Sequence, residues 1–368
     1  MKKLNLFLIA AYTVTTLLSC EKETPAGNKP VQGSDVKSDN PSSLAELKPN
    51  YVYTLVGNPD KYNQEDGIGD QAGFWSLSQL IADNGYLYAL DQDIIRQIKI
   101  SDRTVTTLAG NPLGGDSRDG FKGQAVFSLP SSLALGRDGN IYVAEYSRVR
   151  KVTKEGMVTT IAGSTRGHQD GPAKMAKFNR LISIAVCEDG AIYVIDDQGG
   201  VDSSEFQIRK ISRAGVVSTL AKGPANKPSS FWNISSLSVL NKTLYAAGTG
   251  IFRISSQGIV TTVKESVPVF GNSLLALNDG SFFIASNNQI KKVSAAGNVS
   301  VFAGIPLTDK YARPMEGPAD SVDLLTPSGF TLYNNILYIA VHPHLAQIEA
   351  PSLQQGHVIQ MISVPESH

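Results

Sequence analysis

The chain has 368 residues, with 33 basic and 33 acidic side chains, so it carries no formal net charge at pH 7. A balanced charge gives no electrostatic footprint for nucleic acid, and we exclude that class of partner. The 33 glycines suit a fold with many tight hairpins. The two cysteines, Cys20 and Cys187, provide no disulfide framework, so an apolar core must supply the stability.

Residues 1–19 are predicted to be a signal peptide. Lys2 and Lys3 form a basic start, and residues 4–18 form an apolar run that is too short to span a bilayer comfortably. The run ends in Leu-Leu-Ser-Cys, an order that resembles the bacterial lipoprotein signal. The resemblance implies that Cys20 becomes the lipidated first residue of the mature protein. An ordinary cleaved signal with a chance cysteine is the alternative.

Residues 20–50 combine the lipidated Cys20 with a predicted flexible tether. This stretch is rich in Pro, Gly, Ser, Asn and charged residues and has scarcely an apolar side chain, so it cannot bury enough surface to fold. Its Glu-Lys-Glu start resembles the export signals of surface lipoproteins in Bacteroidetes-type bacteria. The resemblance implies a protein of the cell envelope, anchored by lipid at the outer membrane or cell surface.

A short phrase, Thr-[Leu/Ile]-[Val/Ala]-Gly, recurs from residue 51 onward. It ends at residues 57, 110 and 163, is degraded at 222 and 264, and returns as Val-Phe-Ala-Gly at 304. Between copies, short β-branched runs bounded by Gly turns predict four antiparallel strands per repeat. The inner two strands are apolar on both faces, whereas Arg, Lys and Thr in the outer two predict a solvated rim.

Two unmatched pieces of the repeat predict that the repeats close into a ring. The strand that precedes the phrase has a sixth copy at 358–362 with no phrase after it, and the phrase at 53–57 has no such strand before it. If they pair, the start of the domain completes the last blade and removes exposed sheet edges. The sequence therefore predicts an all-β, six-bladed β-propeller over residues 51–364, with four antiparallel strands per blade, and a tail at 365–368.

The order of residues within a repeat resembles a known family. Asp-Gly…Ala…Phe…Pro, Asp-Gly-Asn-Ile-Tyr-Val-Ala-Glu, Val-Arg-Lys-Val and Val-Thr-Thr-Ile-Ala-Gly are similar to the NHL repeat, whose members form six-bladed β-propellers. The fourth and fifth blades lose the Asp-Gly…Ala…Phe insert. Because the motif residues of this family are structural, the resemblance implies a fold and little chemistry.

One face of the predicted ring should carry the ligand site. The connections from a fourth strand to the next blade share a face with those between second and third strands, and we call it the loop face. The first set is long at 58–78, 111–129, 164–180 and 305–326, and the second set is long at 196–206 and 342–357. A mouth lined by long loops is the default ligand position.

Two groups of residues on the loop face are candidate metal ligands. His342, His344 and His168 would resemble a zinc site of lyases with this fold, and solvated loop histidines are the alternative. Asp91, Glu145 and Asp196 end second strands in successive blades and could hold Ca²⁺, as in lactonase-like relatives; capping of nearby backbone N–H groups is the favoured alternative. The possible cofactors are therefore Ca²⁺ or Zn²⁺.

Other side chains on this face are candidates for ligand binding. Trp75 and Trp232 stand just before first strands, where an exposed aromatic ring could stack on a sugar, with core packing as the alternative. The oxygen-rich stretch 196–205 adds Asp196 and Asp197, and Glu145, His342 and His344 complete the set.

The sequence leaves three functions open. We favour a lipid-anchored extracytoplasmic propeller that binds a glycan, peptide or protein at its loop face, because a rigid scaffold with variable loops suits recognition. A metal-dependent lyase or lactone hydrolase acting at the central channel is the second hypothesis. The third is a structural subunit of an envelope assembly.

Overall fold

The computed structural model describes residues 44–198, 206–222, 234–267, 269, 273–306, 315–324, 326–342 and 356–365. By its internal contacts the chain divides into two units, Met1–Asp39 and Asn40–His368, and every described residue belongs to the second. The predicted signal peptide and most of the tether, with Cys20, lie outside the described residues. No described helix is long and apolar enough to cross a membrane.

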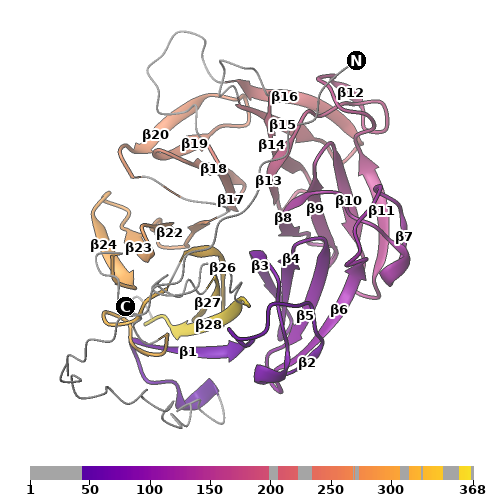
Figure 1. Ribbon diagram of the computed structural model, residues 1–368. Helices are drawn as coiled ribbons and strands as arrows, with labels where there is room; N and C mark the ends of the chain where they lie inside the picture. The colour runs from indigo at the N-terminus through magenta and orange to yellow at the C-terminus, as the bar shows by residue number, and fades with distance from the viewer. Residues whose placement is uncertain are drawn as a thin grey trace, which may run out of the picture. The chain divides into compact units, whose positions relative to one another are not determined.

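The second unit is an all-β ring of six antiparallel sheets, as predicted (Figure 1). The first strands of the blades, in chain order, are β3 (Leu77–Asp83), β8 (Pro130–Leu135), β13 (Leu181–Val186), β17 (Ser236–Leu240), β21 (Leu274–Ala276) and β26 (Pro327–Tyr333). The second strands are β4 (Tyr86–Asp91), β9 (Ile141–Glu145), β14 (Ile192–Asp197), β18 (Thr243–Ala247), β22 (Phe282–Ser286) and β27 (Ile336–Val341). The third strands are β5 (Ile94–Lys99), β10 (Arg148–Val152), β15 (Phe206–Ile211), β19 (Ile251–Ile254), β23 (Gln289–Val293) and β28 (Val358–Ser363). The fourth strands are β6 (Thr104–Gly110), β11 (Met157–Ala162), β16 (Val216–Lys222), β20 (Val260–Lys264), β24 (Val299–Ala303) and, for the sixth blade, β1 (Tyr51–Val56).

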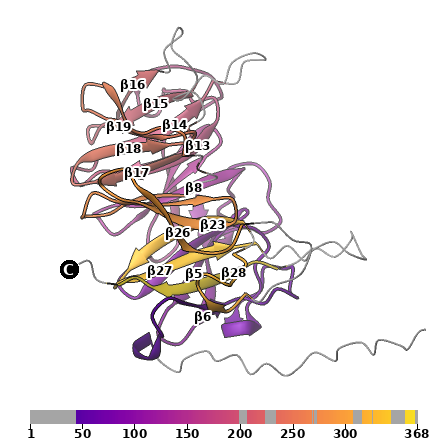
Figure 2. The ribbon, with the colours of Figure 1, turned by 90° about the vertical axis from the view of Figure 1, so that its left-hand side faces the viewer.

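The first strands lie innermost and contact one another around the ring, β26 against β3, β3 against β8, and onward to β21. Figure 2 views the ring from the side, with β26, β27 and β28 seen lengthwise. The buried apolar residues of the described chain form six clusters, one at each junction between neighbouring blades. Each sheet therefore buries both of its faces, which explains the continuous apolar runs of the inner strands.

The first strand of the propeller, β1, closes the ring. Strand β1 pairs antiparallel with β28, with Val52 opposite Ile362 and Tyr53 opposite Met361. The sixth blade thus takes its fourth strand from the beginning of the domain, which confirms the pairing predicted from the two unmatched repeat pieces.

Four blades carry a fifth, two-residue strand that the sequence did not predict. These strands are β2 (Gly67–Ile68), β7 (Gly120–Phe121), β12 (Gly171–Pro172) and β25 (Gly317–Pro318). Each contains the glycine of the Asp-Gly or Glu-Gly insert and pairs with the outer strand of its blade. The fourth and fifth blades lack the insert and have four strands. Short 3₁₀ turns, η2 (Gly69–Gln71) and η3 (Lys122–Gln124), follow two of the inserts, and η1 (Leu44–Glu46) precedes β1.

The glycine that ends the recurring phrase is required by its backbone. Gly110 and Gly163 have φ of 104° and 88°, in the left-handed region. A Cβ atom at Gly163 would lie 2.3 Å from the Ser147 carbonyl oxygen, and one at Gly110 would lie 2.5 Å from that of Asp93. Only glycine fits there, because any side chain would collide with the start of the neighbouring third strand.

Three arginines of the third strands are buried, which corrects the expectation that these strands lie at a solvated rim. Arg96, Arg150 and Arg209 are at most 1% exposed. Each joins a carboxylate in the last two residues of the second strand to the aspartate of the insert. The three carboxylate–arginine clusters are Asp91–Arg96–Asp66, Glu145–Arg150–Asp119 and Asp196–Arg209–Asp170.

Each cluster is completed by an aromatic ring and by the backbone. The guanidinium carbons lie 5.1 to 5.4 Å from the ring centroids of Phe74, Phe127 and Phe178. The Asp-Gly aspartates also accept hydrogen bonds from fourth-strand threonines, as Asp170 does from the Thr219 amide at 2.9 Å. A buried charge is stable only when it is paired and hydrogen-bonded. The terminal nitrogens of the three arginines meet that condition, whereas each buried Nε has no hydrogen-bond partner among the described residues.

Removing one buried arginine tests the structural role of the clusters. We expect Arg150→Met to lower the free energy of unfolding by about 4 kcal/mol, because Glu145 would stay buried without its cation. Arg148→Met on the same strand is the control. Arg148 is half-buried and forms no ion pair with a described residue, so its loss should cost less than about 0.5 kcal/mol in urea unfolding. Equal losses for the two variants would contradict the role given to the cluster.

Candidate functional site

The three carboxylates predicted as calcium ligands are occupied by protein groups. The Asp91 carboxylate accepts hydrogen bonds from the Trp75 and Ser76 amides at 2.9 and 2.8 Å. Glu145 accepts one from the Ser128 amide at 2.9 Å. Burial raises the pKa of Asp91 and of Asp196, against the opposing effects of backbone N–H groups and arginine. These contacts match the capping alternative, and calcium binding stays a prediction.

Of the three candidate zinc ligands, the structure describes His168 and His342, and these two have different partners. His168 Nδ1 lies 3.8 Å from Asp196 Oδ2. The imidazole of His342 instead stacks on that of His357, with 4.3 Å between centroids. His344 lies outside the described residues, as does Trp232. Among the residues that the structure describes, no group of three or more His, Cys, Asp or Glu could hold a metal ion.

Trp75 and His342 meet in a cavity of about 540 Å³ on the loop face, between the sixth and first blades. We call it the Trp75 pocket; its lining also includes Tyr62, Ser78, Ser328 and His357. The Trp75 side chain is 38% exposed, and its ring packs edge-on against Tyr62 with 5.4 Å between centroids. The pocket therefore presents an aromatic surface beside hydroxyl and imidazole groups.

His357 is the residue of this pocket that sequence reasoning missed. Its Nδ1 accepts a hydrogen bond from the Leu77 amide at 3.1 Å, so its proton is on Nε2. Burial, and then the proximity of His342, lowers the pKa of His357 to about 3, so the imidazole is neutral under physiological conditions. The sequence offered one signal, because His357 ends one of the two long loops between second and third strands.

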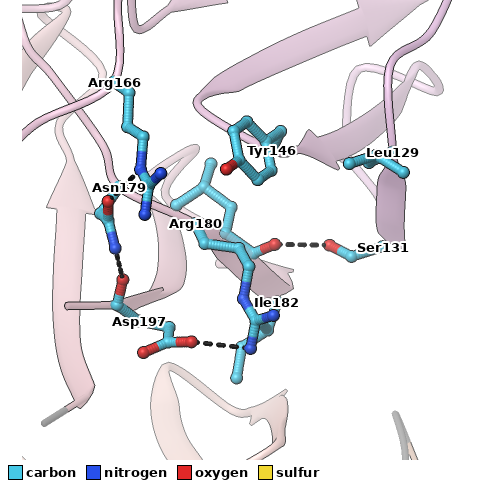
Figure 3. A pocket seen from close by; sticks show the side chains of 9 residues that line it. Leu129, Ser131, Tyr146, Arg166, Asn179, Arg180, Ile182 and Asp197 are labelled. Atoms are coloured by element: carbon cyan, nitrogen blue, oxygen red, sulfur yellow. Dashed lines mark hydrogen bonds and ion pairs between the residues drawn. The ribbon is translucent and has the colours of Figure 1, made fainter. Parts of the chain in front are cut away.

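Asp197 lies in a second cavity of the loop face, of about 600 Å³, between the second and third blades (Figure 3). We call it the Arg166 pocket; its lining includes Leu129, Tyr146, Arg166, Asn179, Arg180 and Asp197. The Asp197 carboxylate forms an ion pair with Arg180, with 2.7 Å between Oδ2 and Nη2. Sequence analysis identified Asp197 as a candidate because it lies in an oxygen-rich stretch, but it did not identify Arg166 and Arg180.

The ring of six sheets defines the chain as a six-bladed β-propeller. No family model matches it. Human teneurin-4 is 32% identical over an alignment of 137 residues, and the match covers 30% of this chain and 5% of the teneurin. The chain thus spans about a twentieth of the length of that curated relative.

Two solved structures share the fold. An auxiliary nutrient binding protein from Bacteroides thetaiotaomicron has a TM-score of 0.59 and 13% identity, over 84% of this chain and 76% of that one. A gluconolactonase from Xanthomonas campestris has a TM-score of 0.53 and 12% identity, over 88% of this chain and 91% of that one. At these identities the likeness carries the fold and no ligand.

The lowered pKa of His357 predicts a stability loss in mild acid. A histidine that stays neutral when folded but gains a proton near pH 6.5 when unfolded makes folding weaker as the pH falls below 6.5. Between pH 7 and pH 5 this group alone should remove about 2 kcal/mol from the free energy of unfolding. His357→Gln keeps an acceptor for Leu77 and should abolish this part of the slope in urea titrations at the two pH values.

The exposed His168 supplies the control for this measurement. His168→Gln should keep the wild-type difference between pH 7 and pH 5. A His357→Gln protein with the same difference as wild type would show that His357 titrates normally in the folded state.

Proposed function

We propose that the protein is a lipid-anchored binding propeller of the bacterial cell envelope, of NHL-repeat type, that holds a glycan in the Trp75 pocket. The observation that carries the proposal is the half-open aromatic corner formed by Trp75 and Tyr62. A tryptophan that remains 38% exposed in a fold with closely packed inter-blade cores leaves apolar surface for a ligand.

The polar lining of the pocket suits a sugar. Ser78 and Ser328 lie on the first strands of the two blades, and His342 directly follows the second strand of the sixth. A sugar ring has apolar C–H faces, which pack on an aromatic side chain, and hydroxyl edges, which need hydrogen-bond partners. The neutral His357, whose proton is on Nε2, keeps the pocket free of a fixed charge at that position.

The proposed task is of the same kind as that of the auxiliary nutrient binding protein that shares the fold. Because folds host unrelated functions, the argument depends on the Trp75 pocket and not on that likeness. Cys20, the Bacteroidetes-type export signal and the tether support a position at the outer membrane or cell surface.

Trp75→Ala should weaken glycan binding about tenfold or more, because stacking and burial of one aromatic ring are together equivalent to at least about 1.4 kcal/mol. A glycan array identifies the oligosaccharide, and calorimetry on the chain from residue 44 onward measures its affinity. Phe121→Ala is the matched control, since Phe121 is similarly exposed at 40% but lies on the outer strand β7. Equal affinities of the Trp75→Ala protein and wild type would overturn the assignment of the pocket.

Tryptophan fluorescence gives an independent readout, because the chain has two tryptophans. Ligand should change the emission of wild type and of Trp232→Phe, and the change should disappear in Trp75→Phe. Retained binding by Trp75→Phe in calorimetry, without the emission change, would locate the ligand beside residue 75.

The lipid anchor is tested separately through its cysteine. Cys20→Ser should abolish labelling of the protein by a fatty acid in growing cells and release it from the membrane fraction, because the acyl chains provide the attachment. Cys187→Ser, which changes the buried cysteine of the propeller, should be labelled and retained like wild type. Labelling of the Cys20→Ser protein would contradict the assignment.

A further inference from the structure

The Arg166 pocket and the Trp75 pocket are equivalent positions of the repeat. In the first, the Ser131 hydroxyl donates to the Leu181 carbonyl of the next blade at 2.9 Å. In the second, the Ser328 hydroxyl donates to the Leu77 carbonyl at 2.7 Å. Each of the two pockets thus lies where a serine of one first strand bridges to the start of the next.

The backbone of the two pockets agrees as well. Leu129 and Thr326, which stand two residues before these serines, both have positive φ, of 51° and 71°. The Asp197 amide donates to the Arg180 carbonyl at 2.8 Å, and the Gln92 amide donates to the Ser76 carbonyl at 2.9 Å. The scaffold is therefore constant, and ligand chemistry depends on the side chains at matching positions.

Those side chains change from aromatic to charged. Asn179 and Arg180 occupy the positions that Trp75 and Ser76 hold in the other pocket. Figure 3 shows Leu129 and Ser131 across the cavity from Asn179 and Asp197. The Arg166 pocket thus has one apolar side and one charged side.

Arg166 is held in place by a buried amide. Its Nε donates to Asn179 Oδ1 at 2.5 Å, and Asn179 Nδ2 donates to the Asp197 carbonyl at 2.6 Å. Asn179 is 6% exposed, so both ends of its amide are fixed. The terminal nitrogens of Arg166 form no hydrogen bond to a described residue, and its guanidinium carbon lies 5.8 Å from the Tyr146 ring centroid.

We propose that the Arg166 pocket binds a carboxylate through the terminal nitrogens of Arg166. The planar pair of Nη groups matches the two oxygens of a carboxylate. Among the described lining residues, Arg166 and Arg180 against Asp197 leave one positive charge, which suits a monoanionic group better than a phosphate dianion. The carbon body attached to the carboxylate packs on Leu129, Tyr146 and Ile182.

Two probes carry this chemistry from different sources, galacturonate and a short peptide with a free C-terminal carboxylate. Their neutral counterparts are the methyl ester and the C-terminal amide. Calorimetry with the chain from residue 44 onward should show saturable binding of one acid and about tenfold weaker binding of its neutral counterpart. Binding of the sugar acid identifies an acidic glycan, and binding of the peptide identifies a chain terminus.

Variants separate a binding role from a structural one. Arg166→Gln should weaken the bound acid about tenfold, whereas Arg137→Gln, which breaks the exposed Arg137–Glu188 ion pair, should leave it unchanged. Asp197→Asn should strengthen binding severalfold, because it removes the negative charge of the pocket. A purely structural role for these residues would not produce opposite signs for the two substitutions.

Three results would overturn the proposal. One is the absence of saturable binding of either acid at about 10 mM, a concentration well above a millimolar dissociation constant. Another is equal binding of acid and neutral counterpart, and the third is tighter binding of inorganic phosphate than of either acid. Because the two pockets are separate, Trp75→Ala should leave carboxylate binding unchanged, so failure of the glycan proposal and failure of this one are distinguishable.

Discussion

The first three blades depend on one repeated interaction, the buried pairing of a second-strand carboxylate with a third-strand arginine. The interaction also includes the loop before the first blade, because the terminal nitrogens of Arg96 donate to the Gly73 and Glu65 carbonyls as well as to Asp91. The long connection that precedes the first blade is thereby tied to the interior of that blade. Such a pair adds little stability over an apolar core, but it fixes one arrangement because every alternative leaves a buried charge unpaired.

The same carboxylates position the residues that line the pockets. Asp91 caps the amides of Trp75 and Ser76, and Asp196 caps those of Asn179 and Arg180 at 2.8 and 3.2 Å. Both pairs of capped residues line a cavity of the loop face. Carboxylates that resemble metal ligands in the sequence therefore hold in place the backbone of residues that line the two cavities.

The fold could be predicted from the sequence because its signals are local and repeated. Short apolar runs, glycine turns and the two unmatched pieces at 53–57 and 358–362 sufficed for the blade count and for the pairing of β1 with β28. The buried arginines could not be predicted in this way, because an Arg on an outer strand is normally solvated and its partners lie 5 to 40 residues away in the sequence. The contact between Leu77 and His357 joins residues 280 positions apart, so no local pattern reveals it.

The two cavities described on the loop face lie at junctions between blades that keep the Asp-Gly or Glu-Gly insert. In the fourth blade Phe252 stands where Arg150 stands in the second, and Gly248 stands where Glu145 does, and the Asp-Gly insert is absent. The fourth blade has therefore lost carboxylate, arginine and insert together, as expected when the burial of each member depends on the other two. The first three blades keep all three members, and the sixth keeps its insert; these four blades build the Trp75 and Arg166 pockets. The backbone and capping contacts are the same at the two junctions, whereas the side chains that line the cavities differ. One junction therefore has an aromatic pocket and the other a cationic pocket. The fold constrains the shared contacts and leaves the lining side chains free to vary.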